Sequence, residues 1–304
     1  MLTSAITLVL ALVAADAADE WLDADTPIAK VAADCKFTEG PAVDAEGNVF
    51  FSDGPNDRIL RTTAAGEVSV FRQPCGRVNG MKFDQSGRLV VCQSSGTGGK
   101  RRVARLAADG AQTPLAERFD GKQLNAPNDL TIDRLGRIYF TDIAAPPEGQ
   151  QPELPSGVYR IDEPGKFVRV IDDLQRPNGI VLSADNGLLY VSDRGTQKLH
   201  RYRVQTDGGL EPDGIVYDFS PDRGIDGLTL DAAGNIWAAA GLEKTTGLWV
   251  ISPAGQRLLH HPMPEFSTNL CFAGSDLRDL YFTAGGSLYK LRTTKPGMRP
   301  VVLP

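Results

Sequence analysis

The sequence lacks most of the short motifs that mark familiar catalytic and redox sites. It contains only three histidines and no His-Glu-x-x-His motif, which excludes the helical zinc-peptidase pattern. Its four cysteines form no Cys-x-x-Cys pair, so a zinc ribbon or a thioredoxin-like redox site is excluded as well. A Gly-x-Ser-x-Gly elbow is missing, and the glycines of residues 96–100 do not have P-loop spacing. Serine-hydrolase and nucleotide-phosphate chemistry therefore have no support in the sequence.

Positive charge is also scarce. The chain has 32 Lys and Arg against 38 Asp and Glu, which gives a net charge of −6. Nucleic acids demand a basic surface to balance their phosphates, and the sequence holds no block of basic residues for an anionic membrane. We expect neither a nucleic acid nor a membrane as a partner.

Long hydrophobic runs are confined to the N-terminus. Residues 5–15 are apolar but too few to span a bilayer, and Ala15-Asp16-Ala17 has the Ala-x-Ala pattern of a cleavage site. We interpret residues 1–17 as a signal peptide and residues 18–304 as the mature domain. The expected location is therefore the periplasm or the extracellular space; a buried N-terminal helix is the alternative.

What the sequence does contain is a sixfold internal repeat. Each copy has a polar residue, an apolar strand, an Asp-x-x-Gly-type turn and a second apolar strand, as in the stretch from Asp226 to Trp237. We call the polar residue that starts each copy the opener. The six openers are Glu39, Asn79, Asn128, Asn178, Asp226 and Asn269.

The spacing of the openers predicts the fold. They recur about every 40–50 residues, which is room for the four short strands of one propeller blade. The 32 glycines and 20 prolines fit many tight turns, and no amphipathic helices separate the strands. We therefore predict an all-β fold, a single six-bladed β-propeller. A strand at residues 28–32 should complete the last blade and close the ring.

The cysteines allow one disulfide. Cys35 and Cys75 stand four residues before successive openers, so they occupy equivalent places in adjacent blades. A disulfide between Cys35 and Cys75 is therefore possible in an exported protein. Cys92 and Cys271 lie within apolar strands, where we expect free, buried thiols.

The openers are candidate metal ligands. The inner strand of a propeller blade starts near the axis, so the six openers should form one ring of side-chain oxygens. Carboxylate and amide oxygens are the ligands of hard divalent cations, and Ca²⁺ tolerates such a mixed set best. Mn²⁺, Mg²⁺ and Zn²⁺ remain alternatives. Asn and Asp are also common at strand starts and in turns without binding a metal, and this is the alternative explanation of the openers. We interpret Asp44, Asp84, Asp133 and Asp231, five residues after their openers, as turn formers and not as ligands.

Several longer motifs resemble one known family. They are residues 124–130 (Leu-Asn-Ala-Pro-Asn-Asp-Leu) leading to Tyr139-Phe140-Thr141-Asp142, residues 176–180 leading to residues 189–193, and residues 268–270 leading to residues 280–286. Arg101-Arg102-Val103 matches as well. Over residues 37–292 the chain resembles the SMP-30/gluconolactonase family, and most closely its bacterial gluconolactonases.

The resemblance implies a six-bladed propeller with one divalent cation, usually calcium, on the axis. The family's ligands correspond to Glu39, Asn178 and Asp226, with Asn128 as a fourth ligand or a substrate contact. Asn79, Arg102, Asn125 and Asn269 are the residues we expect to line the substrate pocket. Animal members have an arginine two residues before the position of Asn128, where this chain has Ala126, so their substrate preference does not carry over directly.

The function that follows is hydrolysis of a small, sugar-derived lactone. The cation would polarise the carbonyl, and Asp226, both axial and anionic, is our candidate for orienting or deprotonating the water. Because a coordinated carboxylate is a weak base, a metal-bound hydroxide is the alternative. A phosphotriesterase-like or aryl-esterase activity on the same site, or a non-catalytic binding propeller, are rival hypotheses. The oligomeric state is left open.

Overall fold

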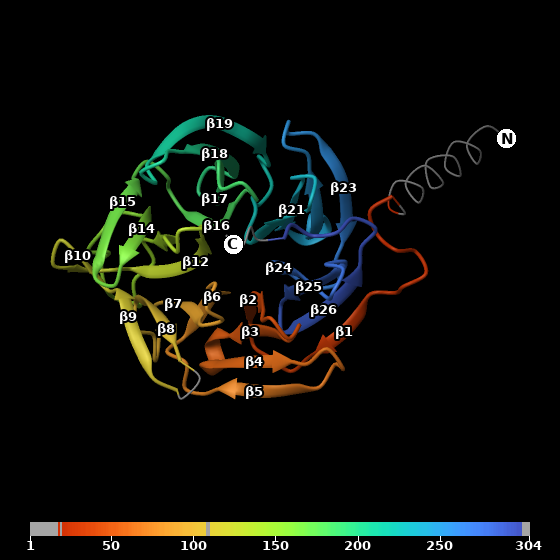
Figure 1. Cartoon of the computed structure of the whole chain (residues 1–304), viewed down its shortest axis with the longest axis horizontal. Coiled ribbons are helices and arrows are strands. Elements are labelled where there is room, and N and C mark those ends of the chain that lie inside the picture. The colour runs from red at the N-terminus through yellow and green to blue at the C-terminus, as the bar shows by residue number, and fades with distance from the viewer. Residues whose placement is uncertain (1–17, 19, 108–109, 300–304) are drawn as a thin grey trace.

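Six four-stranded antiparallel sheets surround a central axis in the computed structural model (Figure 1). The structure describes residues 18, 20–107 and 110–299. The predicted signal peptide, residues 1–17, lies outside the described residues. The predicted all-β, six-bladed propeller is confirmed.

The strands follow the chain from the axis outwards in five of the six blades. From inner to outer strand the blades are: blade one, β2 (Thr38–Val43), β3 (Val49–Asp53), β4 (Arg58–Thr62) and β5 (Val68–Arg72); blade two, β6 (Val78–Phe83), β7 (Leu89–Gln93), β8 (Arg102–Leu106) and β9 (Gln112–Ala116); blade three, β12 (Ala126–Ile132), β13 (Ile138–Ile143), β14 (Gly157–Glu163) and β15 (Lys166–Ile171); blade four, β16 (Pro177–Leu182), β17 (Leu188–Asp193), β18 (Lys198–Val204) and β19 (Leu210–Asp218); blade five, β20 (Leu228–Leu230), β21 (Ile236–Ala240), β22 (Gly247–Ile251) and β23 (Arg257–Pro262).

Blade six is built from both ends of the repeat region. Its inner three strands are β24 (Ser267–Ala273), β25 (Asp279–Ala284) and β26 (Ser287–Arg292), and β1 (Ala29–Ala32) forms the outer strand. β1 pairs antiparallel with β26, with Ala29 opposite Lys290. The segment before the first repeat therefore supplies the fourth strand of the last blade, as the sequence predicts.

The hydrophobic core is divided among the interfaces between neighbouring blades. Six buried clusters occur, and each joins two adjacent blades; Phe50 of blade one and Met81 of blade two share one of them. The second strand of a blade is covered on both faces, so β3 and β21 are buried along their whole length. The outer strand β5 is largely exposed, because nothing packs beyond it. Burial on both faces explains why the second strands have continuous apolar sequences instead of alternating ones.

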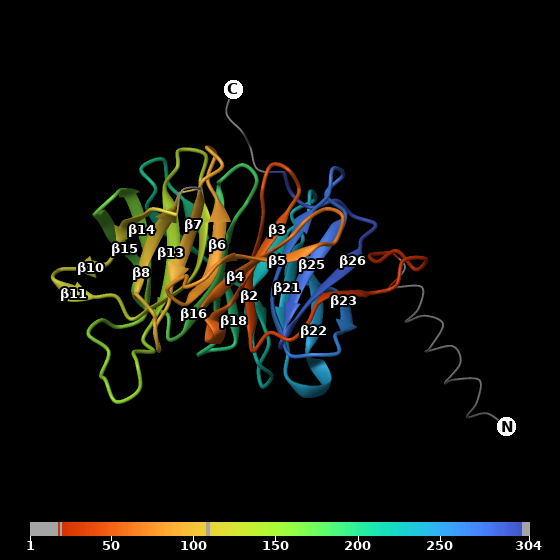
Figure 2. The ribbon, with the colours of Figure 1, turned by 90° about the horizontal axis from the view of Figure 1, so that it is seen from below.

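The two ends of the propeller have different loops. At one end, each Asp of an Asp-x-x-Gly turn accepts hydrogen bonds from backbone N–H groups within its own turn, as Asp44 does from the N–H groups of Glu46 and Asn48. The interpretation of these residues as turn formers is confirmed. The C-terminal segment crosses this end, where Gly297 bridges to Asp231 (Figure 2). The openers lie at the opposite end of the propeller.

Some elements were not expected from the repeat. A two-stranded hairpin, β10 (Arg118–Phe119) with β11 (Lys122–Gln123), precedes blade three, and two short 3₁₀ helices, η1 (Gly54–Asn56) and η2 (Glu243–Thr245), follow second strands. Within the described part of the chain no helix has the length and apolar character needed to span a bilayer.

All four thiols are free, so the possible disulfide between Cys35 and Cys75 is not formed. Burial beside Asp57, to which the Cys75 Sγ–H donates at 3.3 Å, raises the pKa of Cys75 to about 12. Cys92 and Cys271 are buried and free, as the sequence predicts.

Candidate functional site

In five of the six blades, a register shift in the inner strand directs the opener out of the sheet. In five blades the pairing of the inner strand with its neighbour shifts at or next to the opener. The shifts lie between Glu39 and Ala42, Val78 and Met81, Pro127 and Leu130, Pro177 and Ile180, and Ser267 and Asn269. In blade five the regular ladder of β20 begins only at Leu228, after Asp226. Such bulges turn a side chain out of the sheet, and they recur next to functional sites.

The glycine that follows four of the openers is required by the close approach of neighbouring inner strands. A Cβ on Gly40 would lie 2.2 Å from the carbonyl oxygen of Asn79 in the next blade. A Cβ on Gly227 would lie 2.1 Å from Cγ of Asn269. Both distances are below any van der Waals contact, so only glycine fits and the openers are drawn together around the axis.

Buried aspartates at the ends of second strands hold the segments that lead into the openers. Asp142 accepts from the backbone N–H groups of Asn125 and Ala126 at 3.0 and 2.7 Å. Asp193 accepts in the same way from Gln175 and Arg176. Since these carboxylates fix the backbone two or three residues before Asn128 and Asn178, they set the direction from which each inner strand reaches the axis.

Within the described residues, five of the six openers have a side-chain oxygen that accepts no hydrogen bond. Asn178, Asp226 and Glu39 are each 3% exposed, and Asn128 is half-buried. Glu39 Oε2 accepts from the Gly40 N–H at 2.7 Å and from Asn269 Nδ2 at 3.0 Å, but within the described residues Glu39 Oε1, Asp226 Oδ1 and the side-chain oxygens of Asn79, Asn128 and Asn178 accept no hydrogen bond. Axial oxygens without a protein donor can bind a cation or water.

Asn269 occupies a different role from the other amide openers. Its Nδ2 donates to Glu39 Oε2 at 3.0 Å and to Asp129 Oδ2 at 3.5 Å, and its Oδ1 accepts from the Leu270 N–H. Its polar atoms are thus engaged with the protein, and it ties blade six to blades one and three across the axis.

Asp129 is a buried axial carboxylate that the repeat pattern missed. It stands at the position that glycine occupies after four of the openers, and that departure was the available signal. Burial raises its pKa, although Lys82 on β6 lowers it. Burial, with the charges of Asp226 and Asp129, also raises the pKa of Glu39 to about 8. Three acidic groups close enough to perturb one another make this the most anionic part of the axis that the structure describes.

Two arginines that the sequence reasoning also missed bind Asp226. Arg223 Nη2 donates to Asp226 Oδ2 at 2.9 Å, and Arg194 Nη1 approaches the same oxygen at 3.4 Å. Arg223 also donates to the Ser267 carbonyl, and its guanidinium lies 3.9 Å above the ring of Phe266. Arg194 directly follows Asp193, and Arg223 stands three residues before its opener. Neither position belongs to the repeated pattern, so the sequence carries no signal for them.

The remaining predicted pocket residues lie in other settings. Arg102 donates to the side-chain oxygens of Gln93 and Gln112 within blade two, and Asn125 is fully buried with its Nδ2 on the Leu154 carbonyl. Asn79 is half-buried in the ring of openers and makes no side-chain hydrogen bond with the described residues. A substrate contact from any of the three stays a prediction.

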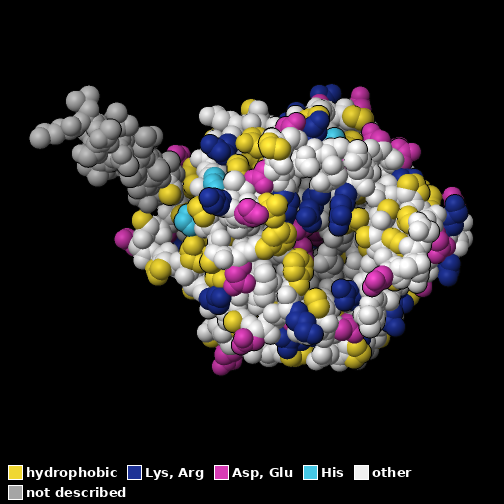
Figure 3. Space-filling model, turned by 180° about the vertical axis from the view of Figure 1, so that it is seen from behind, with side chains coloured by type: hydrophobic (Ala, Val, Ile, Leu, Met, Phe, Trp, Pro, Cys, Tyr) yellow, Lys and Arg dark blue, Asp and Glu magenta, His cyan; other side chains and the backbone are white. Residues whose placement is uncertain are grey.

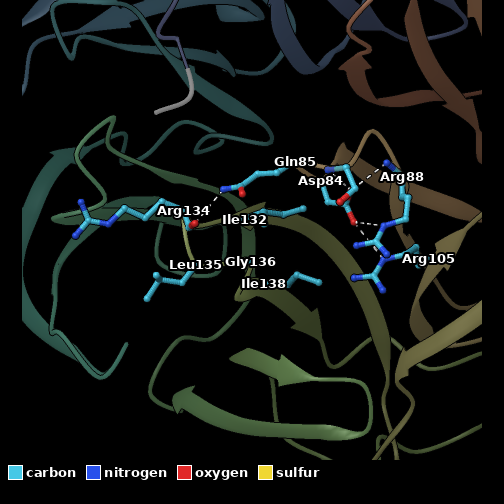
Figure 4. Close-up of a pocket in the computed structure, with 10 residues that line it drawn as sticks. Asp84, Gln85, Arg88, Arg105, Ile132, Arg134, Leu135, Gly136 and Ile138 are labelled. Atoms are coloured by element: carbon cyan, nitrogen blue, oxygen red, sulfur yellow. Dashed lines mark hydrogen bonds and ion pairs between the residues drawn. The ribbon is translucent and has the colours of Figure 1, made fainter. Parts of the chain in front are cut away.

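Two further observations bear on where a ligand could bind in the described part of the chain. A cavity of about 170 Å³ lies at the opposite end, between the turns of blades two and three, where Asp84 is already paired with Arg88 and Arg105 (Figure 4). No cluster of three or more His, Cys, Asp or Glu side chains is arranged for a metal within the described residues.

Known proteins with related sequences share this fold. A gluconolactonase of Zymomonas mobilis is 29% identical over 90% of this chain and 83% of its own length. A solved gluconolactonase from Xanthomonas campestris is 31% identical, with a TM-score of 0.81 over 91% of this chain and 92% of that one. The fold is shared with a calcium-binding protein, regucalcin, of Agrobacterium tumefaciens at a TM-score of 0.71 and 20% identity, over 90% and 98% of the two chains.

The family model described as the SMP-30/Gluconolactonase/LRE-like region matches residues 37–286, a span that holds all six openers. The chain belongs to the SMP-30/gluconolactonase/LRE-like family.

Proposed function

We propose that the protein is a hydrolase that opens a small, sugar-derived lactone with the help of one divalent cation on the propeller axis. The observation that carries the proposal is the set of axial side-chain oxygens without hydrogen bonds, among them those of Glu39, Asn128, Asn178 and Asp226. The relatives whose names include gluconolactonase and lactonase support the substrate class.

The donor set fits a hard cation. Two carboxylates and two amides supply only oxygen, which is the chemistry that Ca²⁺ prefers, and the mixed set suits its flexible geometry. The raised pKa of Glu39, to about 8, reflects burial next to two other carboxylates. A cation would remove that penalty, because it stabilises the ionised form. Glu39, Asn178 and Asp226 would hold the cation, with Asn128 as a further ligand.

The chain's own residues would position the substrate and the water. When bound, the cation would polarise the lactone carbonyl as a Lewis acid. Arg223 and Arg194 hold Oδ2 of Asp226, which leaves Oδ1 without a protein donor among the described residues. From there Asp226 can orient a water and accept its proton.

The chemistry balances as a simple hydrolysis. The water oxygen adds to the acyl carbon, the ring C–O bond breaks, and the departing ring oxygen takes up a proton. The product is a hydroxy acid, which releases one proton to solution at neutral pH, so pH-indicator assays can follow turnover.

The test is lactone turnover with and without the cation, in the wild-type protein and in Asp226→Asn. We expect proton release from a sugar lactone to stop after chelation and to return with added Ca²⁺, and Asp226→Asn to lose about 10²–10⁴-fold in rate. Asp120→Asn on the exposed β10–β11 hairpin is the matched control and should behave as the wild type. An Asp226→Asn protein with full cation content and full rate would refute the role of Asp226. A protein that binds Ca²⁺ but turns over no lactone would favour a binding function.

We further propose, from residues 1–17, that the protein is exported. Fractionation of the native host should find the mature protein, shortened by about the length of a signal peptide, outside the cytoplasm.

A further inference from the structure

Arginines gather at the axial end where the openers lie. Arg77 and Arg176 stand two residues before Asn79 and Asn178, and Arg194 and Arg223 reach Asp226. Lys and Arg side chains stand close together across the centre of this face, which lies behind the view of Figure 1 (Figure 3). This is unexpected in a chain whose net charge is −6.

These arginines have few partners. Within the described residues, the side chains of Arg77 and Arg176 form no hydrogen bond or ion pair with the protein, and Arg194 has only the 3.4 Å contact with Asp226. Arg223 has a side chain only 7% exposed, yet its Nε and Nη1 are buried without a hydrogen-bond partner. Arg223 Nη2 is engaged by Asp226 and the Ser267 carbonyl, whereas Nε and Nη1 can still take a further acceptor; because a buried donor without one is costly, an anion bound here would be stabilised.

The charge balance of the axis gives the same indication. Glu39, Asp129, Asp226 and the neighbouring Asp222 face the cationic side chains of Lys82, Arg194 and Arg223. With the four acids ionised, these charges sum to −1, so a bound divalent cation leaves the site with a net positive charge. Arg77 and Arg176 add to that positive field at the mouth. A neutral sugar lactone uses none of this charge, whereas an anionic one is attracted and oriented by it.

We propose that the lactone substrate itself carries an anionic group, a carboxylate or a phosphate, and that Arg194, with Arg176 and Arg223 beside it, binds that group. Guanidinium groups suit either anion, because their paired N–H groups match two oxygens at once. The substrate class is then the lactones of sugar dicarboxylic acids or of phosphorylated sugar acids. The inference rests on the proposed lactonase function and refines its substrate.

The first test compares matched lactones on the calcium-loaded protein. D-glucaro-1,4-lactone and D-glucono-1,4-lactone have the same ring and differ by one carboxylate, and 6-phosphogluconolactone supplies the phosphate arm. We expect kcat/KM at least tenfold higher for one of the anionic lactones than for the neutral one, and whichever anionic lactone is preferred identifies the anion. Arg194→Gln should reduce that preference at least tenfold. Arg134→Gln, an exposed arginine at the opposite end, is the control and should keep it.

The second test does not depend on turnover. Isothermal titration of glucarate and of inorganic phosphate into the metal-free protein should show one saturable site that weakens at least tenfold in Arg194→Gln. Preference for the neutral lactone, or equal losses on all lactones in Arg194→Gln, would overturn this inference and leave the proposed function intact. Failure to turn over any lactone would overturn the proposed function, and this inference with it.

Discussion

Replacing Glu39 by Gln should make the metal-free protein more stable, although it removes a predicted metal ligand. Glu39 is buried beside two other carboxylates, and these surroundings raise its pKa to about 8. In an unfolded chain a Glu has a pKa of about 4.3. The folded protein must therefore take up a proton at this residue at any pH between these two values.

The sign and the size follow from that difference. A carboxyl group whose pKa is raised by folding binds its proton more tightly in the folded state, so its favourable contribution is full below pH 4.3 and is lost as the pH rises towards 8. One pKa unit corresponds to about 1.4 kcal/mol, so at pH 7 the cost is about 3–4 kcal/mol. Gln is neutral at every pH and its side-chain oxygen can still accept from the Gly40 N–H, as Glu39 does.

The assay is urea unfolding of the wild type and Glu39→Gln at pH 5, 7 and 8, without metal and with excess Ca²⁺. Without metal, we expect the free energy of unfolding of Glu39→Gln to exceed that of the wild type by a few kcal/mol at pH 7 and by less at pH 5. Added Ca²⁺ should stabilise the wild type and not the variant, because only the folded wild type binds it tightly. Glu46→Gln, exposed on the same β2–β3 hairpin, is the control. A variant less stable than the metal-free wild type at pH 7, or with the same pH dependence, would refute the reasoning.

Three further predictions concern other parts of the account. Gly227→Ala should lower the free energy of unfolding by about 1–3 kcal/mol and weaken Ca²⁺ binding in a titration, because the added methyl overlaps Asn269; unchanged affinity would contradict the close-packed axis. Asp226→Asn should weaken Ca²⁺ binding at least tenfold in the same titration, and wild-type affinity would exclude it as a ligand. Burial raises the pKa of Glu265, but hydrogen bonds from Tyr289, Ser287 and Lys30 outweigh it and hold that pKa at about 2. The wild type should therefore lose this contribution, about 1 kcal/mol, as the pH falls from about 4 to 2, and Glu265→Gln should lack that acid-dependent loss in an unfolding series.

The repeat made the fold and the positions of the openers predictable. A polar residue before each inner strand and a turn five residues later locate six inner strands, and the continuous apolar sequence of β21 identifies a strand buried on both faces. The partners of the openers were not predictable in the same way. Arg194 and Arg223 come from loops that differ between blades, and their contact with Asp226 depends on how blades four and five pack together.

Two residues show what a position in the sequence leaves open. Asn269 occupies an opener position, yet its amide is used to join Glu39 and Asp129 across the axis. Arg102 belongs to a family-like motif, but its guanidinium lies within blade two on Gln93 and Gln112. Sequence spacing places a side chain at the start of a strand; which atom it binds is decided by neighbours that are distant in the sequence.

The measurement that tests the central claim most directly is a stoichiometric titration of metal-free protein with Ca²⁺ while proton release from a sugar lactone is followed. The account predicts that turnover is absent at first, rises in proportion to bound Ca²⁺ and reaches its plateau at one cation per chain, and that Glu39→Gln shifts the rise to much higher concentration. Full turnover by the metal-free protein, or a plateau reached identically by Glu39→Gln, would contradict it.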